Sequence, residues 1–181
     1  MPELLIGCGS NREKILKVQG RPQEWTDLTT LDFNADHKPT VVWDLEKLPY
    51  PFADEQFDEI HAYEVLEHTG TQGDWMFFFA QWSEFWRMLK PGGYFCGSCP
   101  LPTSVWAWAD PSHKRIIAPE TLTFLDQAEY TKQVGKTALS DFRFCYQGDF
   151  QRMGTKTAGE TFFFVLQAVK PSRITVPRGA V

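Results

Sequence analysis

The sequence predicts an α/β fold in which a mostly parallel sheet is covered on both faces and has an antiparallel hairpin at one edge. Two observations lead to this prediction. In the first half of the chain, short apolar runs alternate with segments that have helix caps or helical apolar spacing. Near the end, two apolar runs are joined by a polar loop with three glycines. The 181 residues suit one domain over residues 1–181, because a domain has about 150 residues.

The first part of the chain predicts four strands and a short helix. Residues 3–6 form a largely apolar run that stops at a glycine turn, and residues 12–19 can form a helix capped by Ser10 and Asn11. Further strands are expected at residues 28–33, 40–43 and 57–63, followed by a helical turn at residues 64–68.

A long helix is predicted from Trp75 to Leu89, where Lys90-Pro91-Gly92-Gly93 ends it. Its apolar residues recur at spacings of three and four, so one face is built to be buried. Met76 and Phe77 add apolar side chains on other faces, which makes the first half apolar nearly all round. Either a neighbouring loop or a second subunit must cover it, so a homodimer is one alternative.

The last part of the chain predicts a fifth strand, one helix and the hairpin. The expected elements are a strand at 94–98, an irregular stretch at 100–117, a helix at 119–127, strands at 142–146 and 161–169, and a loop at 147–159.

Composition and charge exclude several classes of protein. The net charge of −5 gives no basic excess for nucleic acid or an anionic membrane. The longest apolar run, Trp75 to Ala80, is far shorter than the ~20 residues that span a bilayer, and the start of the chain does not resemble a signal peptide. We therefore expect a cytoplasmic protein that binds neither nucleic acid nor membrane. The four cysteines include a CxxC pair, Cys96 and Cys99, which we interpret as buried strand residues.

Groups suited to ligand binding stand where the predicted strands end. In an open parallel sheet, ligands bind beyond the carboxyl ends of the strands. The first four strands end at Gly7-Cys8-Gly9, Asp32, Asp44 and Glu64. Each alone could be a turn or a solvated carboxylate, but together they predict a ligand site. The spacing from Gly9 to Asp32 suits an acidic residue that binds ribose hydroxyls, whereas Arg12 replaces the third glycine of a dinucleotide motif.

Five motifs of this chain occur in the order and spacing of one family. They are Leu5-Ile6-Gly7-Cys8-Gly9, Leu31-Asp32, Asp44-Leu45-Glu46-Lys47-Leu48-Pro49, Val65-Leu66-Glu67-His68 and Arg87-Met88-Leu89-Lys90-Pro91-Gly92-Gly93. Through them the sequence resembles the class I S-adenosylmethionine-dependent methyltransferases, of the methyltransferase type 11-like kind. The resemblance implies a Rossmann-like, doubly wound sheet of seven strands with the last antiparallel, and S-adenosylmethionine as cofactor.

The same resemblance implies which residues bind that cofactor. The turn Gly7-Cys8-Gly9 would face its methionine part, Asp32 its ribose, and Asp44 with Leu45 its adenine. The start of the Glu64 segment would lie near the methionine end.

The chain departs from the family pattern at two points. Leu5 stands where the family often has an acidic residue, and the first strand starts near residue 3, where the family usually has preceding helices. These departures motivate an alternative: a non-catalytic protein that keeps the fold and binds the cofactor or a protein partner.

Methyl transfer requires mainly that the acceptor be aligned with the methyl group, plus a base where the acceptor must lose a proton. Glu64, His68 and His113 are the candidate catalytic residues, acting on a small-molecule acceptor. Lys114 and Arg115 could bind an anionic acceptor.

A metal site is the other interpretation of these residues. Glu64, Glu67 and His68 would share one face of a helix, and with His113 they offer ligands for a divalent ion. The alternative is that His68 only packs or hydrogen-bonds near the cofactor. We favour the interpretation without a metal, so the sequence assigns no metal ligand.

Overall fold

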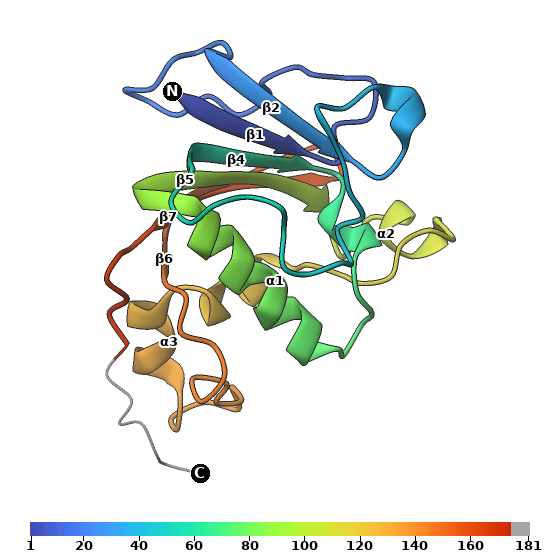
Figure 1. Cartoon of the computed structure of the whole chain (residues 1–181). Coiled ribbons are helices and arrows are strands. Elements are labelled where there is room, and N and C mark those ends of the chain that lie inside the picture. Colours follow the sequence, from blue (N-terminus) through green and yellow to red (C-terminus); the bar gives the residue numbers. More distant parts are fainter. Residues whose placement is uncertain (175–181) are drawn as a thin grey trace.

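Seven strands form one mixed sheet in the order β3-β2-β1-β4-β5-β7-β6 (Figure 1). The structure is a computed structural model and describes residues 1–174. The strands are β1 (Pro2–Ile6), β2 (Asp27–Asp32), β3 (Val41–Val42), β4 (Phe57–Tyr63), β5 (Leu89–Pro100), β6 (Phe150–Ala158) and β7 (Thr161–Ala168). Strands β1 to β5 pair in parallel, and β7 runs antiparallel to both β5 and β6. The predicted fold class is therefore confirmed.

The helices are few and mostly short. They are η1 (Ala35–His37), η2 (Leu66–His68), α1 (Trp75–Met88), α2 (Trp106–Ala109), η3 (Pro119–Phe124) and α3 (Gln127–Gln133). Helix α1 starts at Asp74, whose carboxylate accepts a hydrogen bond from the Phe77 amide at 3.0 Å. Helices α1 and α3 lie on the same side of the sheet (Figure 1). Among residues 1–174, no helix combines the length and apolar character that crossing a bilayer requires.

The sheet face toward α1 is covered by aromatic rings. Trp82 and Phe85 of α1 are buried against Phe95 of β5, with ring centroids 4.8 and 4.9 Å apart. Phe164 of β7 stacks on Phe95 at 6.2 Å. Much of the high aromatic content of this chain therefore lies in one core between α1 and the sheet.

The opposite face of β1 and β4 is polar and lacks the predicted helix at residues 12–19. Within residues 7–26 the chain is irregular. The Lys14 ammonium reaches the carboxylates of Glu3 and Glu59, at 2.6 and 2.8 Å, and all three side chains are fully buried. The Leu16 amide donates to the Tyr63 hydroxyl at 3.0 Å instead of to a helical carbonyl. The helix prediction was wrong because these contacts with the sheet replace helical hydrogen bonds.

The C-terminal predictions also need correction. Residues 142–146 form a turn rather than a strand, and the predicted loop at 147–159 contains β6. Strand β6 escaped prediction because Gln151–Ala158 is exposed on both faces, so it has no apolar alternation. The predicted helix at 119–127 is η3 followed by α3, which begins after the capping residue Asp126. The first four strands, α1 and β7 agree with their predictions in position, whereas β5 begins at Leu89 instead of residue 94. The stretch at 100–117, which was predicted to be irregular, contains the short helix α2.

Candidate functional site

The turn after β1 is open to a ligand at Gly9. Both Gly7 and Gly9 have positive φ angles, of 58° and 50°. A Cβ at Gly7 would lie 2.2 Å from Cγ2 of Val65, so this glycine permits close packing, whereas a Cβ at Gly9 would meet nothing within 4 Å. The Cys8 side chain is buried, and burial raises the pKa of its thiol. Only the backbone of this turn is therefore available to a ligand.

Asp32 joins the carboxyl ends of β1 and β2. Its Oδ2 accepts from the Gly9 amide at 2.8 Å, and its Oδ1 accepts from the Asn34 amide at 2.9 Å. The residue is 5% exposed. A carboxylate has about four acceptor positions, so Asp32 fixes the glycine turn and retains capacity for a ribose hydroxyl.

Asp44 lies beyond the end of β3, next to Asp32. The two are linked through Trp43, whose amide donates to the Asp32 carbonyl at 2.9 Å. Asp44 is half-buried, and its Oδ1 accepts from the Glu46 amide at 3.0 Å. Leu45 is buried in the core. Of the two residues expected at the adenine, Asp44 is the accessible one.

Glu64 follows β4 in a left-handed conformation, with a φ of 49°, that is uncommon outside glycine. Its amide donates to the Ser98 carbonyl at 3.1 Å, and its Oε1 accepts from the Ser98 hydroxyl at 2.7 Å. The strained backbone thus directs the carboxylate toward β5. Glu64 precedes η2, so it does not share a helical face with Glu67 and His68 as the sequence suggested. Sequence reasoning missed Ser98, whose only signal was its place near the end of a strand.

Glu67, His68 and His113 come together beside this position. Their candidate ligand atoms all lie within 4.8 Å of one another. Glu67 is buried, and burial raises the pKa of its carboxyl to about 8. His68 is half-buried, and its partial burial lowers the pKa of the imidazole. His68 and His113, which the sequence predicted as site residues, are therefore neighbours in space. The Ser112 carbonyl, which precedes His113 in the chain, contacts the His68 ring although the two residues are 44 positions apart in the sequence.

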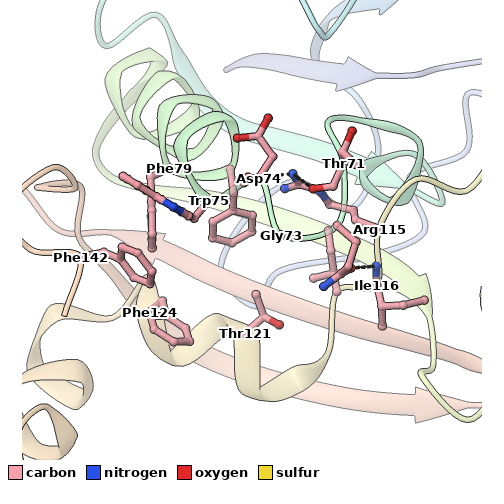
Figure 2. Close-up of a pocket in the computed structure, with 13 residues that line it drawn as sticks. Thr71, Gly73, Asp74, Trp75, Phe79, Arg115, Ile116, Thr121, Phe124 and Phe142 are labelled. Carbon is pink, nitrogen blue, oxygen red and sulfur yellow. Dashed lines mark hydrogen bonds between the residues drawn. The ribbon is translucent and has the colours of Figure 1, made fainter. Parts of the chain in front are cut away.

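A cavity of about 170 Å³ lies at the start of α1 (Figure 2). Aromatic rings from α1, η3 and the turn at residues 142–146 form much of its wall, together with Arg115. Its lining includes Trp75, Phe78, Phe79, Arg115, Ile116, Thr121, Phe124 and Phe142. One feature of the sequence indicates this cavity, the apolar character of the first half of α1. Phe142 was missed because its segment was predicted to be a strand, whereas Phe124 lies in a segment predicted to be helical, as η3 is.

The two basic residues expected near an acceptor differ in environment. The Lys114 ammonium lies 2.6 Å from the Glu46 carboxylate. Arg115 is 6% exposed, and its Nη2 donates to the carbonyls of Thr71 and Asp74 at 3.1 and 3.3 Å. Within residues 1–174 no carboxylate forms an ion pair with Arg115, and burial lowers the pKa of its guanidinium. Arg115 is thus the basic group that can meet an anion in the cavity.

Several solved structures with this architecture are methyltransferases. A SAM-dependent methyltransferase from Archaeoglobus fulgidus is 18% identical, with a TM-score of 0.57 over 92% of this chain and 85% of that one. The N-methyltransferase NodS from Bradyrhizobium japonicum WM9, in complex with S-adenosyl-L-homocysteine, is 14% identical, with a TM-score of 0.56 over 92% and 77% of the two chains. At such identities the likeness shows the fold, which is the α/β methyltransferase fold.

A third structure has the same fold with a bound acceptor. It is the 1,6-didemethyltoxoflavin-N1-methyltransferase from Burkholderia thailandensis with 1,6-didemethyltoxoflavin and S-adenosylhomocysteine, 12% identical, with a TM-score of 0.56 over 93% and 71% of the two chains. No curated protein matches the sequence. A family model described as a methyltransferase domain matches residues 4–97, which is more than half of the chain. The chain therefore belongs to the methyltransferase-domain family.

Proposed function

We propose that this protein transfers a methyl group from S-adenosylmethionine to a small acceptor. The observation that carries the proposal is the arrangement of Gly9, Asp32 and Asp44. They lie at neighbouring strand ends inside the segment that matches the methyltransferase family. The open space above Gly9 is the space that a cofactor needs to approach the backbone.

Three contacts would hold the cofactor. The backbone of Gly9 would face the methionine part, Asp32 would accept from the ribose hydroxyls, and Asp44 would accept from the adenine amine. The bound cofactor would supply a methyl group attached to a sulfonium sulfur, and the neutral thioether that remains after transfer is a good leaving group. The work left to the protein is orientation, which contributes about 7–11 kcal/mol in well-aligned reactions.

A proton must leave the acceptor where the acceptor is a hydroxyl or a charged amine. Glu64, His68 and His113 are the groups we propose for this step. The Oε1 atom of Glu64 is held by the Ser98 hydroxyl, which leaves Oε2 to accept a proton, and partial burial raises the pKa of this carboxyl. His68 bonds the Ser112 carbonyl through Nδ1, which leaves Nε2 as its acceptor.

The aromatic cavity is the place that we propose for the acceptor. Its volume of about 170 Å³ is close to the ~150 Å³ of a protein cavity that holds benzene, which suits one ring. Rings of α1 and Phe142 would cover the faces of that ring, and Arg115 would favour an anionic substituent. The bound acceptor of the Burkholderia thailandensis methyltransferase supports a small-molecule substrate by analogy alone.

Calorimetry with S-adenosylmethionine and S-adenosylhomocysteine tests the cofactor site. We expect both to bind the unmodified chain, and Asp44→Asn to weaken binding by about 10-fold, the effect of losing roughly one hydrogen bond of 1.4 kcal/mol. Asp36→Asn, on η1 outside the proposed contacts, is the matched control and should bind as the unmodified chain does. Absence of binding at millimolar concentrations of both ligands would contradict the proposed function.

A second candidate function is cofactor binding without catalysis. It is favoured by the irregular segment at residues 7–26, which offers no helix N-terminus to the methionine carboxylate. Leu5 in place of an acidic residue points the same way. An acceptor screen on chain saturated with cofactor separates the two: turnover of any single-ring acid or phenol supports the enzyme, and cofactor binding with no turnover supports the second candidate.

A further inference from the structure

Two segments distant in sequence are tied together at Glu67. The amides of Lys114 and Arg115 both donate to the Glu67 carbonyl, at 2.8 and 3.1 Å. Two residues before Lys114, the Ser112 carbonyl faces Nδ1 of His68 at 3.2 Å. These backbone contacts place His113 against His68, with ring centroids 4.7 Å apart. Main-chain hydrogen bonds therefore position the cluster of Glu67, His68 and His113, so its geometry does not depend on flexible side chains alone.

The Glu67 carboxylate is buried without a partner. The residue is 2% exposed, and within residues 1–174 neither carboxylate oxygen has a hydrogen-bond partner or an ion pair. The Cys99 thiol lies beside it, but a thiol is only a weak donor. Nδ1 of His113 is likewise buried without a partner. An isolated buried carboxylate is costly, so this geometry requires either a bound cation or a neutral carboxylic acid.

The hydrogen bond of His68 fixes which of its nitrogens can bind a metal. A carbonyl oxygen can only accept, so Nδ1 carries the proton that points to Ser112. Nε2 then keeps its lone pair. Histidines that bind metals commonly donate their other ring N–H to a carbonyl or a carboxylate in this way. The Asp110 carboxylate lies 3.9 Å from Nε2 of His113, which is too far for a hydrogen bond.

We propose that Glu67, His68 and His113 bind a divalent transition-metal ion; in the metal-bound protein the two histidines are ligands, and Glu64 alone remains as the base for the proposed methyl transfer. Two imidazoles and one carboxylate form a ligand set that suits zinc and its first-row neighbours. Metal–ligand bonds are about 2.0–2.2 Å, so two ligands at the tetrahedral angle around one ion are about 3.4 Å apart. The ligand atoms all lie within 4.8 Å of one another, so their side chains must move closer together to bind the ion. Three protein ligands leave a coordination position for water or for an oxygen of an acceptor.

Titration of untagged, chelator-treated protein with Co²⁺, followed by its visible absorption and then by displacement with Zn²⁺, tests the site. We expect one Co²⁺ per chain. Glu67→Gln and His113→Gln should each weaken binding by more than about 100-fold, the upper limit for loss of an outer-shell partner. His37→Gln removes an imidazole that lies on η1, outside the cluster, and should bind as the unmodified chain does.

The folding of the variants is checked by thermal unfolding without metal. Glu67→Gln should fold, because it replaces a buried carboxylate that has no partner by a neutral amide. Metal should raise the melting temperature of the unmodified chain and not that of Glu67→Gln. Failure of the unmodified chain to bind Co²⁺, Zn²⁺ or Mn²⁺, or unchanged binding by folded Glu67→Gln, would overturn the site. Because metal binding is measured directly, that failure would leave the proposed methyl transfer standing.

Discussion

The two faces of the sheet are buried in different ways. On one face, α1 covers β5 and β7 with aromatic rings around Trp82. On the other, an irregular segment covers β1 and β4 with the buried charges of Lys14, Glu3 and Glu59. Trp25 closes this second face, since its ring lies 4.8 Å from that of His61 and 5.1 Å from the Lys14 ammonium.

The difference shows two routes to a covered sheet. Apolar burial contributes about 25 cal/mol per Å² and depends little on the exact partner. Buried charges stabilise the fold only when each has an oppositely charged partner. Loss of one partner leaves the remaining charges unpaired in an interior of low dielectric constant. The α1 face should therefore respond to lost volume, and the opposite face to lost charge balance.

The largest expected effect is on the α1 face. Trp82→Ala removes a fully buried ring that contacts Phe85, Phe95 and Phe150, and should lower the free energy of unfolding by about 5 kcal/mol. Met76→Ala, in the same helix but exposed, should change it by less than about 0.5 kcal/mol. Urea denaturation measures both. A loss below about 2 kcal/mol for Trp82→Ala would mean that the core is not built around this ring.

A somewhat smaller effect is expected on the opposite face. Lys14→Met leaves Glu3 and Glu59 without their cation and should cost about 3–4 kcal/mol. Lys17→Met is the matched control, because the Lys17–Glu24 pair is exposed and should contribute less than about 1 kcal/mol. Equal stability of Lys14→Met and Lys17→Met in urea would show that the second face is not held by charge balance.

The sequence predicted one face much better than the other. Phe79, Trp82 and Phe85 recur at three-residue spacing because all three are buried on one face of α1. This spacing predicted the ends of α1 to within one residue. On the opposite face, Asn11 does accept from the Glu13 amide at 2.9 Å, as a capping residue would, but no helix follows. Local capping signals could not reveal that Lys14 would turn toward two carboxylates on different strands.

The candidate site was predictable where it depends on strand ends. Gly9, Asp32 and Asp44 lie at the carboxyl ends of β1, β2 and β3, as parallel topology requires. The contact of His113 with Glu67 was only partly predictable, because it depends on backbone hydrogen bonds between a loop and η2. Such contacts leave no periodic trace in the sequence.

The smallest expected effect is the pH dependence of the charged face. Burial lowers the pKa of His61 below its ordinary 6.5, and its neutral ring fits between the Glu59 carboxylate and the Tyr63 hydroxyl, at 2.9 and 2.6 Å. A lowered histidine pKa means that the unfolded chain binds a proton first, so this stability is present above pH 6.5 and is lost as the pH falls through the folded value. Contacts with Lys14 and His61 lower the pKa of Glu59, which adds a second loss below 4.5.

The contribution of the charged face to the urea denaturation midpoint should therefore fall in two stages between pH 7.5 and 4, against the opposite trend from Glu67, whose pKa of about 8 adds stability as the pH falls. His61→Gln should flatten the stage that begins at pH 6.5, because the glutamine does not titrate, and should reduce without abolishing the stage below 4.5, because Lys14 still lowers the pKa of Glu59. His37→Gln, which changes a half-buried imidazole outside this network, should keep both stages. If the stage that begins at pH 6.5 is unchanged in His61→Gln, another group causes it, and the charged face does not account for the pH dependence of stability in that range.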